Sequence, residues 1–113
     1  MRSFGFAWAG IGYTWNHEPN FRIELVVGSL ALLLSFWLQV SPIPVLLMGA
    51  MVLSLEILNS AIEALVDLAS PDIHPLAKIA KDAAAGAVFL ASVMALIIGL
   101  VWMGPRLLQK LGF

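Results

Sequence analysis

The chain has 113 residues, of which 61% are hydrophobic and only 12% are charged. A mean hydropathy of +0.96 is too apolar for an ordinary water-soluble domain, so the chain needs a bilayer. The net charge of −1 gives no basic excess and argues against nucleic-acid binding, and the absence of cysteine excludes disulfides, thiolate catalysis and cysteine metal sites.

The first segment of the chain is rich in aromatic residues. Its bulky apolar side chains recur at nearly helical spacing, at Phe4, Phe6, Trp8, Ile11 and Trp15. This spacing predicts an amphipathic helix that lies on the membrane surface. The alternative is a disordered, aromatic-rich leader.

A helical hairpin is predicted to follow. Residues 25–55 carry no charge, but Pro42 and Pro44 interrupt them. Two prolines within three residues disfavour a continuous helix. We therefore expect one span at about 23–40 and another from about residue 44 to the late sixties, each long enough for a hydrocarbon layer that takes about 20 helical residues.

A second charge-free run, residues 83–105, predicts the third span. Gly104 and Pro105 are expected to end it, with Trp102 at the membrane interface. Residues 70–75, before this span, form a turn with a proline near each end. The sequence thus predicts an all-α membrane protein with three transmembrane helices and an N-terminal surface helix. Three helices enclose little interior, so we expect a homo-oligomer.

Basic residues predict the orientation. The turn between the first two spans is uncharged, whereas the opposite face carries Arg2, Arg22, Lys78 and Lys81. The positive-inside rule places that face in the cytoplasm. Arg106 and Lys110 lie at the other face and weaken this bias without reversing it.

The second span carries a polar stripe on an otherwise apolar helix. At about 100° per residue, four side chains fall within roughly 80° of one another, namely Glu56, Asn59, Glu63 and Asp67. Carboxylates at membrane depth are costly, and they usually face a partner, a cation or a water-filled site. The alternative is that they pair with basic residues to bind helices together, although few basic residues lie at that depth.

More charged side chains lie at the same boundary. They are Lys78, Lys81 and Asp82 on one face of the third helix, and Glu18, Arg22 and Glu24 before the first span. A contact of its ammonium group with lipid phosphate is enough to account for Lys78. Lys81 suits a nucleotide phosphate if it faces the stripe. Carboxylates for Mg²⁺, cations for phosphates and one further carboxylate as a base are what phosphoryl transfer needs.

Two other interpretations remain open from the residues alone. The sequence has no Walker-type glycine loop and no protein-kinase signature, so a nucleotide site would have to be built differently. A small proton- or cation-translocating protein would also use carboxylates within the membrane. A structural subunit would gain little from several costly carboxylates on one stripe.

Three segments resemble the prokaryotic diacylglycerol kinase family, which includes the undecaprenol kinases of Gram-positive bacteria. They are residues 18–24 (EPNFRIE), 56–63 (EILNSAIE) and 74–82 (HPLAKIAKD). The similarity runs through nearly the whole chain, so residues 1–113 are expected to form a single domain of this family. The resemblance implies a homotrimer that uses MgATP to phosphorylate a lipid hydroxyl at the cytoplasmic face of a bacterial cell membrane, in active sites shared between subunits.

The resemblance also implies roles for individual residues. Glu56 matches the general base, and Asn59 helps to hold the lipid hydroxyl and the base. Glu18 and Glu63 match the metal-binding glutamates that also contact ATP. Further ATP contacts match Asp72, Ile73, His74, Lys81 and Asp82, and the lipid-binding segment includes Phe21, Arg22 and Glu24.

The acceptor lipid stays open between undecaprenol and diacylglycerol. The branch of the family that phosphorylates diacylglycerol has an arginine near its N-terminus, for which only Arg2 is a counterpart, and a serine where this chain has Ala85. Residues 71–82, followed by alanine-rich sequence, look more like the undecaprenol kinase branch. We therefore favour a polyprenol.

Overall fold

A computed structural model describes residues 2–113, and all the regular structure in this range is helical. The helices are α1 (Arg2–His17), α2 (Pro19–Trp37), α3 (Ile43–Ala69) and α4 (Pro75–Lys110). The last three are long and apolar enough to cross a membrane. The prediction of an all-α protein is therefore confirmed, and three of its helices have the length and composition that a membrane span needs.

Prolines set where the long helices begin. Pro19 and Pro75 are the first residues of α2 and α4, and Pro44 is the second residue of α3. Proline fits the first turn of a helix because the N–H groups there have no intrahelical partner. The His74 side chain also caps α4, since its Nδ1 accepts a hydrogen bond from the Leu76 N–H at 3.1 Å.

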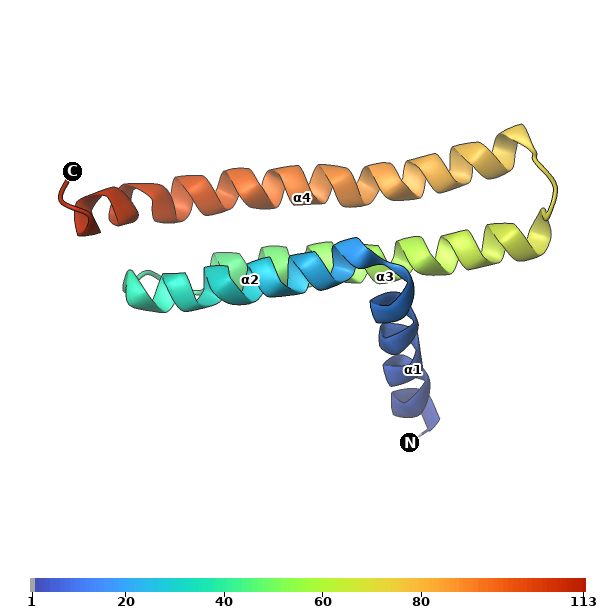
Figure 1. Cartoon of the computed structure of the whole chain (residues 1–113), viewed down its shortest axis with the longest axis horizontal. Coiled ribbons are helices and arrows are strands. Elements are labelled where there is room, and N and C mark those ends of the chain that lie inside the picture. The colour runs from blue at the N-terminus through green and yellow to red at the C-terminus, as the bar shows by residue number, and fades with distance from the viewer. Residues whose placement is uncertain (1) are drawn as a thin grey trace.

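The long helices form a thin layer in which α3 contacts both α2 and α4. The molecule measures 57 × 37 × 18 Å, and α1 runs at a steep angle to the long helices, pointing away from α4 (Figure 1). In the apolar windows of α2, α3 and α4, only 11%, 22% and 17% of residues are buried. Most of the apolar surface therefore faces outwards, as expected for helices that contact lipid or further subunits.

The N-terminal segment is a continuous helix, so it is not a disordered leader. Phe4, Phe6 and Trp8 are exposed. Thr14, near the other end of α1, is buried, and its hydroxyl donates to the Gly10 carbonyl at 3.0 Å. The location of α1 on the membrane surface stays a prediction.

Helix α4 does not end at Gly104 and Pro105, as the sequence predicted, but continues to Lys110. A proline inside a helix removes one backbone hydrogen bond. Three side chains near the end of α4 instead donate to carbonyl groups around the α2–α3 turn: Trp102 to Ser41 at 3.0 Å, Arg106 to Leu38 at 3.0 Å and Lys110 to Trp37 at 3.3 Å. These contacts hold the helix against the turn and help to offset the lost bond.

Candidate active site

Carboxylates from three parts of the chain gather where α2 and α3 meet the α1–α2 junction. We call this group the carboxylate cluster, and it comprises Glu18, Glu24, Glu56, Asn59, Ser60 and Glu63. The Glu56 carboxylate lies near those of Glu24, Glu18 and Glu63. Glu56 is only 2% exposed, and Asn59 and Ser60 are also buried. The first two residues of the predicted stripe, Glu56 and Asn59, therefore face the interior of the protein.

Glu18 occupies the single residue between α1 and α2, where the backbone is extended. A residue that precedes proline avoids the helical region, so Pro19 helps to fix this kink. The Ser60 hydroxyl donates to Glu18 Oε1 at 3.2 Å. Burial, and then the negative charge of Glu63, raise the pKa of Glu18 above its ordinary value.

Glu24 connects the cluster to α4. The Ser92 hydroxyl of α4 donates to Glu24 Oε1 at 3.1 Å. Both residues line a cleft of about 390 Å³ between α2, α3 and α4, whose other lining residues are apolar apart from the Trp102 indole N–H. The cluster thus adjoins a space suited to a hydrocarbon chain.

Three oxygen atoms of the cluster are buried without a hydrogen-bond partner among residues 2–113, namely Glu24 Oε2, Glu56 Oε1 and Asn59 Oδ1. The Asn59 amide nitrogen donates to Glu63 Oε1 at 3.1 Å, which leaves the Asn59 amide oxygen as the unpartnered atom of this side chain. A buried acceptor without a donor costs about 1–3 kcal/mol. Three such atoms in one cluster are acceptors that a hydroxyl donor or a cation would satisfy.

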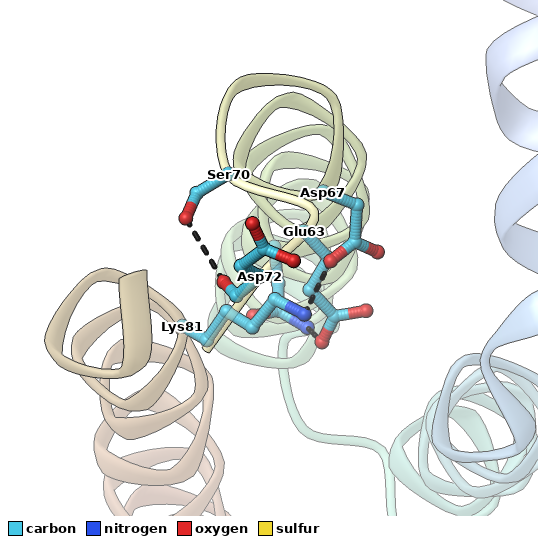
Figure 2. A network of polar contacts seen from close by, with 6 residues as sticks. Glu63, Asp67, Ser70, Asp72 and Lys81 are labelled. Carbon is cyan, nitrogen blue, oxygen red and sulfur yellow. Dashed lines mark hydrogen bonds and ion pairs between the residues drawn. The ribbon is translucent and has the colours of Figure 1, made fainter. Parts of the chain in front are cut away.

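A second polar group lies at the α3–α4 turn, around a pocket of about 270 Å³ that we call the turn pocket. Its lining includes Asp67, Asp72, Ile73, His74, Lys81 and Asp82. Lys81 Nζ lies 2.5 Å from Asp67 Oδ1 and within range of the Glu63 charge (Figure 2). Lys81 therefore connects the turn pocket to the carboxylate cluster.

The predicted site residues fall into these two connected groups, with two exceptions. Phe21 is buried at 4% exposure, and the exposed Arg22 lies 6.0 Å from the centre of the Trp15 ring. Within the turn pocket, Asp82 pairs with Lys78 at 2.5 Å. The roles of all these residues in binding lipid or ATP stay predictions.

Two serines that shape the cluster were missed in the sequence. Ser60 lies four residues after Glu56, and this spacing placed it beside the stripe. Ser92 lies inside the charge-free third span, where no pattern distinguishes it from a serine that merely packs between helices. The contact between Ser92 and Glu24 joins residues 68 positions apart, so local spacing does not reveal it.

Glu18 and Glu63 fit a divalent cation. Their carboxylates are close enough for the charge of Glu63 to perturb Glu18, and a cation would relieve this repulsion. No three His, Asp or Glu side chains converge as a metal site within residues 2–113. Mg²⁺ does not need three, because one or two carboxylates commonly hold it together with substrate phosphates and water.

The fold and these two groups define a small membrane protein with an acidic site shared by its spanning helices. The family model for prokaryotic diacylglycerol kinase matches residues 5–103. The chain belongs to this family, as its motifs predicted, and it is a lipid kinase.

Similar proteins carry two names. A diacylglycerol kinase of Synechocystis is 42% identical over 95% of this chain, which spans only 63% of that protein. An undecaprenol kinase of Bacillus subtilis is 44% identical, and the match covers 95% of this chain and 89% of that protein. A diacylglycerol kinase of Escherichia coli is 40% identical, and the match covers 86% of this chain and 82% of that protein.

Proposed function

We propose that the protein transfers the γ-phosphoryl group of MgATP to the hydroxyl group of a membrane lipid, with Glu56 as the general base. The observation that carries this proposal is the Glu56 carboxylate, which is 2% exposed, lies beside other carboxylates and has an oxygen without a hydrogen-bond partner. A carboxylate inside a membrane helix is costly, and a role in catalysis explains it. Membership of a lipid kinase family supports this activity over proton or cation translocation.

In the proposed reaction, Glu56 accepts the proton of the lipid hydroxyl while the hydroxyl oxygen forms a bond to the γ-phosphorus. The bond from that phosphorus to the bridging oxygen breaks, and ADP leaves. Asn59 orients the hydroxyl, and Lys81 neutralises phosphate charge at the turn pocket. Glu18 and Glu63 would hold Mg²⁺, which offsets negative charge on the phosphate oxygens when bound.

The acceptor that we propose is a polyprenol such as undecaprenol. Ala85 replaces the serine of the diacylglycerol-phosphorylating branch, and residues 71–82 are similar to the undecaprenol kinase branch. The relatives' names alone do not decide the matter, since proteins of both names are similarly close to this chain.

We also propose that the active site faces the cytoplasm of a bacterial cell and that the protein works as a homotrimer with shared sites. The orientation is supported by Arg22, Lys78 and Lys81 at the face that carries the site. Assembly is supported by the apolar surface that one copy leaves exposed on its three long helices.

The test is a radiolabelled-ATP assay on the purified protein in lipid nanodiscs that contain undecaprenol and diacylglycerol together. We expect Mg²⁺-dependent transfer of label mainly to undecaprenol. Transfer only to diacylglycerol would contradict the proposed acceptor. An absence of label in any lipid would contradict the kinase itself.

A further inference from the structure

Ser92 and Ser60 differ from Ser29 and Thr14 in where their hydrogen bonds go, because both donate to a glutamate from another part of the chain. Ser29 and Thr14 donate to the backbone of their own helix, to Leu25 at 2.8 Å and to Gly10 at 3.0 Å. Such local bonds are the usual solution for a hydroxyl inside a helix. Ser92 instead donates to the Glu24 carboxylate of another helix.

This hydrogen bond fixes how Glu24 meets the rest of the cluster. It occupies Oε1 of Glu24, and the remaining oxygen, Oε2, is buried without a partner. The Glu24 carboxylate also lies against that of Glu56, whose Oε1 is unpartnered as well. Two neighbouring carboxylates, one buried and one half-buried, repel each other unless a proton, a cation or a hydrogen-bond donor lies between them. A lipid alcohol supplies such a donor.

The surroundings of Ser92 suit a lipid alcohol. Ser92 and Glu24 are the hydroxyl and carboxylate residues in the lining of the apolar cleft. Along α2 and α4 they precede the apolar lining residues, which continue to Leu34 and Leu107. The cleft thus has a polar end at the carboxylate cluster and a long apolar part.

We propose that Ser92 is a positioning residue for the lipid acceptor: it holds one oxygen of Glu24, so that the other oxygen and Glu56 Oε1 together receive the acceptor hydroxyl at the polar end of the cleft. This inference rests on the proposed kinase function and deepens it. Ser92 acts through Glu24 and takes no part in binding ATP.

The sharpest test compares Ser92→Thr with Ser92→Val, because threonine and valine have nearly the same shape and differ in the hydroxyl. We expect Ser92→Val to lower kcat/KM for the lipid about tenfold, the effect expected of a hydrogen bond to a charged group, and to leave the KM for ATP within about twofold. Ser92→Thr should stay close to wild type. Ser29→Val, which removes a hydroxyl bonded only to backbone, is the matched control and should change neither constant.

A double-mutant cycle tests whether Ser92 acts through Glu24. In a Glu24→Leu background, which removes the oxygen that accepts the hydrogen bond from Ser92, we expect Ser92→Val to change lipid kcat/KM by less than about twofold. An additional full drop, equal losses for lipid and ATP, or equal behaviour of the valine and threonine variants would overturn the inference. If the valine variant does not fold, Ser92→Ala replaces it in the same comparison.

The failure of this inference is distinguishable from failure of the proposed function. Wild-type protein that labels no lipid overturns both. Wild-type protein that labels lipid, with valine and threonine variants alike, overturns only the role of Ser92.

Discussion

Glu56 is the residue on which the proposed chemistry depends most. Glu56→Gln keeps the size of the side chain but removes its ability to accept a proton. We expect kcat to fall by at least about a hundredfold, since a general base contributes about 10²–10⁴ in rate. Steady-state transfer of label from ATP to lipid in nanodiscs measures this.

The control for Glu56→Gln is the stability of the variant. Removing one negative charge from among neighbouring carboxylates should leave the thermal unfolding temperature equal to wild type or higher. A variant that keeps most of its activity would show that another group takes the proton. Ser54→Ala, an exposed position on the same helix, should be indistinguishable from wild type.

The two lysines at the start of α4 should behave differently. Both lysines line the turn pocket, but Lys81 lies within range of Glu63, whereas Lys78 forms an exposed pair with Asp82 on its own helix. Both ion pairs are exposed, and exposed ion pairs contribute little to stability because water screens their charges. Replacing either lysine should therefore hardly change the unfolding temperature.

We expect Lys81→Met to raise the KM for ATP at least about tenfold, because it removes a hydrogen bond between two charged groups, the ammonium and the phosphate. Lys78→Met is the comparison: Lys78 also lines the pocket but pairs with Asp82 and does not approach Glu63, so this substitution should raise the KM for ATP less than Lys81→Met does. Measuring KM for ATP at saturating lipid gives the comparison. Equal effects of the two substitutions would remove Lys81 from the nucleotide site.

At the scale of elements, Glu18 joins α1, α2 and α3, because it lies in the break between the first two helices and accepts a hydrogen bond from Ser60. Its pKa is raised in the folded protein, so folding favours its protonated form. The resulting stabilisation is fully present below the ordinary glutamate pKa and is lost as pH rises through the raised value. The Glu18→Gln variant has no ionisable group at this position, so it lacks this pH dependence.

Without metal, we therefore expect the thermal stability of wild-type protein to fall relative to that of Glu18→Gln as pH rises through this window. Thermal unfolding in detergent with a chelator, followed at several pH values, measures the difference. A difference between the two proteins that is independent of pH would contradict the raised pKa of Glu18.

The start of α3 could be predicted from the sequence more accurately than the ends of α2 and α4. Pro42 and Pro44 break the apolar run through covalent geometry, so the turn was placed to within a few residues. Helix α2 begins earlier than expected, at Pro19, because charged residues in its first turns do not prevent a helix. The continuation of α4 beyond Pro105 depends on contacts with carbonyls that lie 61 to 73 residues away in the sequence, which no local pattern contains.

The same distinction holds for the candidate site. The stripe through Glu56, Asn59 and Glu63 follows from helical periodicity on one element, and its approach to Glu18 follows from none. Family motifs supplied Glu18 because they carry information about tertiary contacts. Ser92 lies outside the quoted motifs and became visible only when α2 and α4 were placed together.

At the scale of the whole molecule, one copy is a thin layer that leaves large apolar side chains exposed on all three long helices. Close packing between copies would bury part of this surface. We expect native mass spectrometry of the protein in detergent to show a trimer. A predominant monomer or dimer at working concentration would contradict the proposed assembly.

Shared active sites require more than trimer formation, because each site must contain residues from two subunits. If one site takes Glu56 from one subunit and Lys81 from its neighbour, two inactive variants can complement each other. Co-expressed Glu56→Gln and Lys81→Met chains should then form mixed trimers in which some sites contain both wild-type residues, and part of the activity should return. If mixed trimers form but recover no activity, each site takes all its residues from one subunit, and assembly only buries apolar surface.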